Sequence, residues 1–122
     1  MRISEIGYEG PPPIDSYGGG GFRIAGAFRP GGLLLTPGGV ANWPVTSAPG
    51  PEDFASVIAQ AAEIDVLLVG MGPEIAPLPV AARLALEAAG VGVEVMSTPS
   101  ACRTYNVLMS EGRRAASALI AV

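Results

Sequence analysis

The residue types most able to do chemistry in this chain gather around its only cysteine, Cys102, which Arg103 follows directly. Thr98 and Pro99 are typical of a helix start, since threonine caps the first turn and proline suits the first helical position. A helix N-terminus and a neighbouring guanidinium both favour a thiolate. We therefore predict that Cys102 is more acidic than a free thiol. The alternative is a small, buried and unreactive cysteine.

A glycine-containing loop, Gly70-Met71-Gly72-Pro73, follows the apolar run 66–69, and residues 97–100 follow the expected strand 91–96. If both runs are parallel strands, both loops leave the sheet at the end where ligands bind in open α/β folds. Helix amides and a guanidinium there suit a carboxylate or a phosphate. The candidate ligand or partner groove comprises Gly70, Gly72, Thr98, Cys102, Arg103, Thr104 and Tyr105.

The same glycine loop also has a simpler interpretation. Gly70-x-Gly72 lacks the third glycine of a dinucleotide-binding fingerprint, because Ile75 stands in its place. Pro73 also removes an amide from any phosphate cradle. We therefore favour a tight structural turn over a phosphate site.

A third feature is the run Asp15, Ser16 and Tyr17 beside four consecutive glycines, residues 18–21. These three residues are a candidate flap over a ligand. The alternative, which we favour, is a turn in which Asp15 accepts hydrogen bonds from backbone amides.

The composition excludes several kinds of site. The chain has no histidine, which removes histidine-based nucleophile pairs, histidine general bases and mixed Cys/His zinc sites. The formal charge is -4 and the seven cations form no basic stripe, so nucleic-acid binding is not expected. We expect no metal and no cofactor, and we assign no catalytic residue. A single cysteine permits no intrachain disulfide and fits a cytoplasmic protein.

Length and composition predict one domain. The chain has 122 residues, of which 49% are hydrophobic and 15% charged, which is typical of a compact globular fold. Residues 1–13 are interpreted as an N-terminal extension and residues 14–122 as a single domain. We expect neither a secretory signal nor a membrane span, because no apolar run is long enough.

The hydrophobic pattern predicts an α/β fold with a parallel βαβ arrangement. We expect a hairpin that joins 22–28 to 33–35 around the turn Pro30-Gly31-Gly32. The other expected strands lie at 40–43, 66–69 and 91–96. The expected helices lie at 52–62 and at 80–89, where Gly90 closes the helix, and a third begins near Pro99.

The end of the chain poses a conflict between propensity and a helix-ending signal. Residues 115–121 are rich in alanine and by propensity would extend the preceding helix. Gly112 suits a helix-ending position instead. We predict that the helix ends there and that Arg113 to Ile120 form a strand of the central sheet.

Several motifs together resemble a known family. PPIDSYGGGGFRIAG, LLLTPGGVANW, LLVGMGP, VGVEVMST and ACRTYNVLMSEGRRAASALI are similar to the Mth938-like domain family. This family includes the mitochondrial respiratory complex I assembly factor 3 and bacterial relatives, and its molecular function is not known. The resemblance extends from about residue 14 to residue 120.

The resemblance implies a three-layer α/β domain with a central mixed sheet, whose last strand runs antiparallel to the others. It implies no established catalytic activity. Cys102, Arg103 and Tyr105 stand in the family's helix-start motif, and the segment Ser16-Tyr17-Gly18 in its early loop motif.

Two functional hypotheses follow. The first is a noncatalytic interaction or assembly factor linked to the maturation of a respiratory complex, with protein subunits of that complex as partners. The alternative is a small-molecule or anion-binding protein, or an enzyme, that uses Cys102 and Arg103. The lack of histidine, of metal-ligand clusters and of a complete nucleotide motif favours the first. The oligomeric state is left open.

Overall fold

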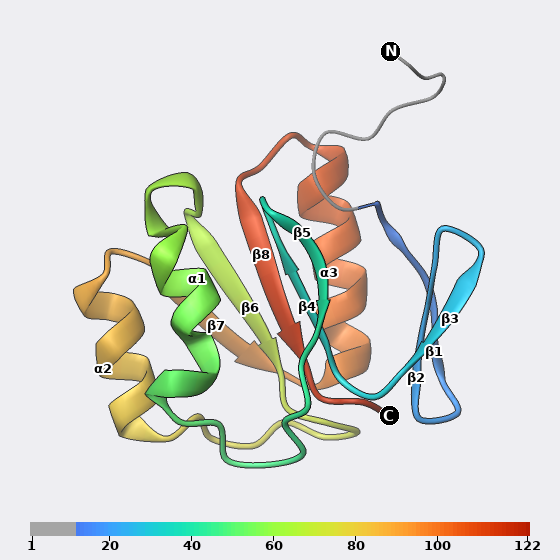
Figure 1. The fold of residues 1–122 in the computed structure, drawn as a ribbon, viewed down its shortest axis with the longest axis horizontal. Coiled ribbons are helices and arrows are strands. Elements are labelled where there is room, and N and C mark those ends of the chain that lie inside the picture. The colour runs from blue at the N-terminus through green and yellow to red at the C-terminus, as the bar shows by residue number, and fades with distance from the viewer. Residues whose placement is uncertain (1–11) are drawn as a thin grey trace.

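The computed structural model describes residues 12–122, which form three layers (Figure 1). Two helices cover one face of a five-stranded sheet, and a longer helix and a small three-stranded sheet cover the other. The prediction of a three-layer α/β domain with a central mixed sheet is confirmed. Of the expected N-terminal extension, residues 1–13, all but the last two residues lie outside the described part of the chain.

The central sheet has the strand order β5-β4-β8-β6-β7. Its strands are β4 (Leu33–Thr36), β5 (Gly39–Asn42), β6 (Val66–Gly70), β7 (Gly92–Met96) and β8 (Ala115–Leu119). Strand β6 pairs in parallel with both β7 and β8, whereas β4 is antiparallel to β5 and β8. The expectation that the last strand opposes all the others is therefore wrong. The strand that reverses is β4, which is antiparallel to both of its neighbours, β5 and β8.

One face of the sheet is covered by short helical segments. They are the 3-10 helix η1 (Pro51–Phe54), α1 (Ala55–Ala59), the 3-10 helix η2 (Ala61–Glu63) and α2 (Val80–Ala88). Trp43 anchors this layer: its ring lies 5.5 Å from that of Phe54, and its indole N–H donates to the Asp53 carbonyl at 2.8 Å. The expected helix over 52–62 is thus interrupted, while the helix expected over 80–89 forms and is followed by Gly90 with a φ of +86°.

The other face of the sheet carries α3 (Thr98–Ser110) and the small sheet of β1 (Ile14–Gly18), β2 (Gly21–Ile24) and β3 (Ala27–Pro30). Side chains from both sheets and from α3 share one core cluster, which includes Phe22, Leu35, Leu68 and Tyr105. Alternate residues of β6 and β8 face this cluster or the cluster on the opposite face, as expected for strands buried on both sides.

The hairpin of the small sheet differs from the expected one. Strands β2 and β3 pair around Ala25 and Gly26, both of which have left-handed backbone, with φ of 52° and 81°. Residues 33–36 leave this sheet and join the central one. The turn at 30–32 therefore connects two sheets instead of two strands of one hairpin.

The end of α3 confirms the role predicted for Gly112. This glycine has a φ of +74°, its amide donates to the Met109 carbonyl, and the Arg113 amide donates to the Leu108 carbonyl at 2.9 Å. These two bonds form a Schellman motif, which satisfies carbonyls at a helix end. The chain then extends into β8, which runs from Ala115 to Leu119 within the expected range.

Candidate functional site

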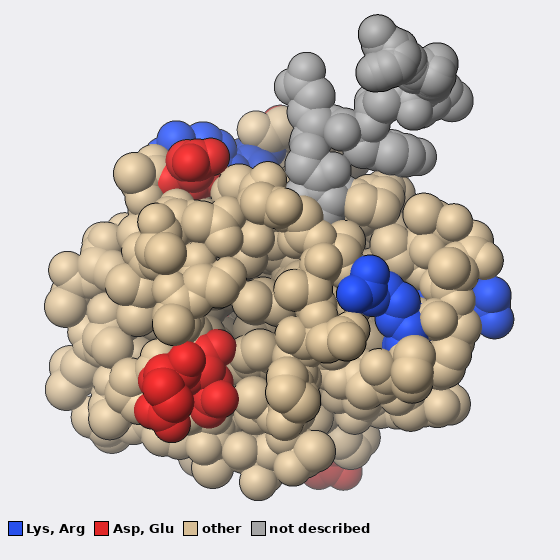
Figure 2. Space-filling model, viewed as in Figure 1, with Lys and Arg blue, Asp and Glu red and all other residues tan. Residues whose placement is uncertain are grey.

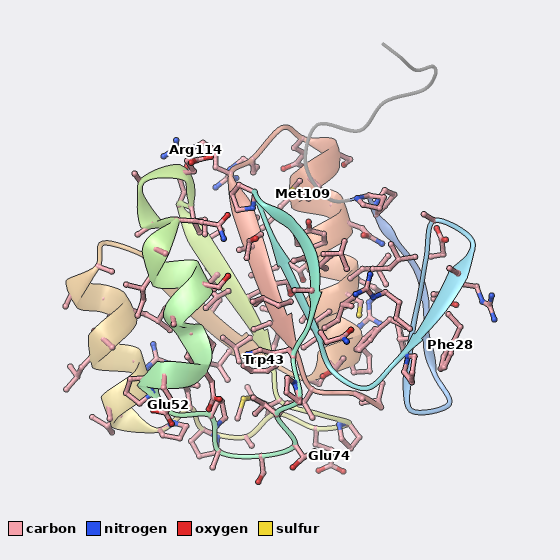
Figure 3. The ribbon with its side chains drawn as sticks, in the orientation of Figure 1. Phe28, Trp43, Glu52, Glu74, Met109 and Arg114 are labelled. Atoms are coloured by element: carbon pink, nitrogen blue, oxygen red, sulfur yellow. The ribbon has the colours of Figure 1, made fainter. Side chains whose placement is uncertain are left out.

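The two loops expected to form a groove do lie together. Because β6 and β7 are parallel, the loops leave at the same edge of the sheet. The Met71 amide donates to the Met96 carbonyl at 2.9 Å, and the Thr98 amide donates to the Gly72 carbonyl at 2.7 Å. Figure 3 shows Glu74, which belongs to the first loop, at the edge toward which β6 and β8 point.

Thr98 closes the space between these loops. Its hydroxyl accepts from the Gly72 amide at 3.0 Å and donates to the Ile120 carbonyl at 2.7 Å. The residue is fully buried, and a Cβ on Gly70 would lie only 2.8 Å from the Thr98 Cα. We call Gly70, Gly72, Thr98 and Ile120 the Thr98 junction. It is a packed, hydrogen-bonded contact between loops rather than an open crevice.

The helix cap is Ser97, not Thr98 as expected. The Ser97 hydroxyl accepts from the Ser100 amide at 3.3 Å, and Pro99 lies in the first turn as predicted. Thr98 is already the first residue of α3. Its hydroxyl is used between loops, which a local capping pattern does not reveal.

The polar and reactive side chains of the early part of α3 point to different sides. Cys102 and Tyr105 are buried in the core beneath the small sheet, with 2% and 0% of their surface exposed. Arg103 is exposed, and its guanidinium donates to the Ser100 hydroxyl at 3.4 Å. Thr104 is half-buried. Residues one apart on a helix do not share a face, so Cys102 and Arg103 do not converge on one ligand.

Burial governs the ionisation of the cysteine. Desolvation raises the pKa of Cys102 to about 12, and the nearby Arg103 lowers it by less. The prediction of an acidic thiol is therefore wrong, because the core position outweighs the guanidinium. Burial also raises the pKa of Tyr105, whose hydroxyl has no hydrogen-bond partner among the described residues.

The candidate flap is part of a strand. Asp15, Ser16 and Tyr17 belong to β1, and Ser16 and Tyr17 pair with residues of β2. The Asp15 carboxylate accepts from the Gly26 amide at 3.3 Å, as the favoured interpretation expected, but Asp15 lies in a strand and not in the expected turn. Tyr17 is 40% exposed at the outside of the molecule.

Asn106 is a structural residue that the sequence reasoning missed. Its side chain accepts from the Ile14 amide at 2.9 Å and donates to the Ile14 carbonyl at 2.8 Å. The amide side chain thus replaces a neighbouring strand and fixes β1 to α3. The sequence signal for its importance is its place in the distinctive motif Cys102-Arg103-Thr104-Tyr105-Asn106.

A hollow of about 430 Å³ lies beyond the Thr98 junction, where the loop after β6 meets α2 and β7. Its lining is formed by Ile75, Ala76, Pro77, Leu78, Arg83 and Val95. Of this lining, Ile75 is a large apolar side chain that is 69% exposed, and Val80 and Leu84 of α2 are also exposed, at 70% and 59%. From the sequence we considered the start of this loop, Gly70 to Pro73, as part of a groove or as a tight turn, and we did not consider the apolar run Ile75-Ala76-Pro77-Leu78 that follows it.

Charges are unevenly distributed over the visible face. Figure 2 shows acidic atoms at the lower left, where Figure 3 labels Glu52, and arginine atoms at the right, over the small sheet. On that sheet the Arg23 guanidinium lies 6.0 Å from the centre of the Phe28 ring, and Arg29 donates to Asn42 at 3.2 Å. Within residues 12–122, no group of three or more side chains is placed to hold a metal ion.

The layers, the mixed sheet and the buried start of α3 define a class of small α/β domain, and comparisons with known proteins name its family. The chain belongs to the family described as "protein of unknown function (DUF498/DUF598)", which matches residues 14–120. A solution structure from Bordetella pertussis, described as a Mth938-like domain, is 30% identical with a TM-score of 0.71 and covers 98% of this chain and 92% of its own.

Relatives with other descriptions are also similar. An uncharacterized protein of Rhodobacter capsulatus is 50% identical over 98% of this chain and 93% of its own length. The mouse NADH dehydrogenase (ubiquinone) 1 alpha subcomplex assembly factor 3 is 37% identical over 98% of this chain. The match spans 66% of the mouse protein. A crystal structure described as an outer membrane protein of Bartonella henselae is 38% identical, covers 95% of this chain and 99% of its own, and has a TM-score of 0.90. No helix within the described residues has the length and apolar character needed to cross a bilayer.

Proposed function

We propose that this chain is a noncatalytic interaction or assembly factor that acts in the cytoplasm during the maturation of a respiratory complex. The observation that carries the proposal is the 37% identity to an assembly factor of NADH dehydrogenase over 98% of this chain. The match spans 66% of that relative, so its role is transferred here only as a hypothesis.

The use of the chemically interesting side chains supports a noncatalytic role. Thr98 joins two loops, Tyr105 fills the core, and Cys102 is buried with a raised pKa. A thiol in this state is a poor nucleophile at neutral pH, because only the thiolate reacts readily. The apolar hollow with exposed Ile75 in its lining is instead typical of a surface that binds protein.

A complementation experiment tests the proposal. The gene is deleted in the source organism, and the amount of assembled respiratory complex I is measured on native gels and by NADH oxidation in membranes. We expect the deletion strain to have less assembled complex. We expect the wild-type chain, Cys102→Ala and Arg103→Ala each to restore the assembled complex. Normal assembly in the deletion strain would refute the proposal.

The alternative function makes the opposite prediction for the two variants. If Cys102 and Arg103 act on a small molecule, each alanine variant fails to restore function although the protein is folded. A thermal-shift screen of metabolites supplies the second measurement, because ligand binding to the native state raises its stability. A stabilisation by one metabolite that Arg103→Ala abolishes would favour the small-molecule function.

A further inference from the structure

The outer edge of β7 has backbone groups that face away from the sheet. The Gly92 amide donates to the Asp65 carbonyl at 3.1 Å, and the Met96 carbonyl accepts from the Met71 amide at 2.9 Å. Because backbone groups alternate in direction along a strand, the amides and carbonyls of Val93 and Val95 face outward. In the described part of the chain β7 is the last strand on its side of the sheet, so no described strand pairs with this edge.

The hollow lies directly beside this edge, since Val95 belongs to both. Apolar side chains of the loop before α2 line it, and exposed Ile75 extends the apolar surface outward. A free strand edge beside an apolar pocket is the arrangement by which proteins bind an extended peptide as an added strand: the main chain supplies affinity, and pockets for alternate side chains supply specificity.

The charges around the hollow define the partner's chemistry. Arg83 is the cation in its lining, and its contact with Glu87 is a long 3.8 Å between side chains that are 39% and 52% exposed. Such a surface pair is weak and leaves the guanidinium able to bind a carboxylate of a partner. An added strand that turns apolar and acidic side chains toward the hollow therefore complements it.

Glu94 argues against a second copy of the same chain as the occupant. It lies between Val93 and Val95 and is exposed. If two β7 strands paired antiparallel through their outward groups, Glu94 would stand opposite its own copy, and like charges directly opposite are destabilising. A basic side chain opposite Glu94 would be favourable instead.

We propose that β7 binds an extended segment of another protein as a sixth strand, with alternate apolar side chains in the hollow and a carboxylate on Arg83. This deepens the proposed function, because it names the surface and the kind of segment by which the chain holds a partner. It does not depend on which complex the partner belongs to.

The binding test uses the full chain and the acetylated, amidated heptapeptide Thr-Val-Lys-Val-Thr-Asp-Thr, which places valines and aspartate on one face and lysine on the other. We expect NMR shift changes and slowed amide exchange at Val93 and Val95. Arg83→Gln, or asparagine in place of the peptide's aspartate, is expected to weaken binding about tenfold or more. Val93→Pro should also abolish binding, since it removes an outward amide that the sheet does not use, and edge strands tolerate proline.

Several results would overturn the inference. One is NMR shift changes confined to the small sheet around Phe28, and another is peptide binding by Arg83→Gln as tight as by the wild-type chain. A third is a dimer in sedimentation that Val93→Pro dissociates, because this would assign the edge to a second copy. Arg83→Gln keeps the test valid if the proline variant does not fold. Peptide binding without any effect of gene deletion on complex I would refute the proposed function alone, and normal complementation without peptide binding would refute this inference alone.

Discussion

A single loop, residues 71–79, contributes to two regions of opposite character. Its first residues enter the Thr98 junction, where Gly72 exchanges two hydrogen bonds with Thr98. Its later residues line an open hollow, and Ile75 there is 69% exposed. The polar contacts of Gly72 and Thr98 thus stabilise the fold, whereas an apolar part of the same loop forms the accessible surface. We therefore look for a function at the hollow and not at the Thr98 junction.

The largest expected effect concerns the reactivity of Cys102. Its pKa is raised from 9.0 to about 12, so the thiolate fraction near neutral pH falls about a thousandfold. We expect iodoacetamide to modify the native protein only as fast as it unfolds. Mass spectrometry of time points with and without urea measures this.

The raised pKa of Cys102 also predicts how the free energy of unfolding depends on pH. Because the folded pKa lies above the unfolded value, the contribution of the protonated thiol is complete below about pH 9.0 and is lost as the pH rises toward about 12. Cys102→Ala, which has no thiol, should lose less stability over that interval. Rapid alkylation of the native protein at neutral pH would instead show an activated cysteine at the start of α3, close to the Thr98 junction in the chain, and would weaken the contrast with the hollow.

The next largest effect is expected at the Thr98 junction. Thr98→Val keeps the shape but leaves the Gly72 amide and the Ile120 carbonyl without the hydroxyl that both use. Each buried group left unsatisfied costs about 1–3 kcal/mol. Urea denaturation of Thr98→Val and of the matched control Thr104→Val, a half-buried threonine of the same helix, measures the difference. Equal stabilities of the two variants would show that the junction is not a structural centre.

Much of this architecture was predictable from the chain because it depends on local patterns. The uninterrupted apolar run of β6, the Gly90 helix end and the Gly112 Schellman motif each follow from residue type and spacing. The hairpin around Ala25 did not, because a left-handed alanine carries no sequence signal. The direction of β8 was misjudged because pairing order is a property of the whole sheet.

The candidate site was less predictable than the fold, for a physical reason. Helical spacing indicates that Cys102 and Tyr105 share a face and that Arg103 does not, but it does not say which face is buried. That depends on the small sheet, which docks on α3 through Asn106. Burial then reverses the expected shift of the thiol pKa.

A smaller effect, of opposite sign, is expected at Tyr105. Its hydroxyl is buried without a partner among the described residues, so Tyr105→Phe removes an unsatisfied polar group while it keeps the ring. We expect the free energy of unfolding to rise by up to about 1–3 kcal/mol. Chemical denaturation of the variant measures it. A clear loss of stability would reveal a hydrogen bond of this hydroxyl in the core between α3 and the sheets.

The smallest effect is expected at Leu84, an exposed residue of α2. Its side chain is 59% exposed, so Leu84→Gln should change the free energy of unfolding by no more than about 0.5 kcal/mol. Leu86, two residues on, is fully buried, and Leu86→Ala should cost about 2–5 kcal/mol. Denaturation of both variants under the same conditions compares them. If Leu84→Gln were as damaging as Leu86→Ala, the exposed apolar side chain of Leu84 would serve the fold, as the Thr98 junction does, and would not be an accessible surface.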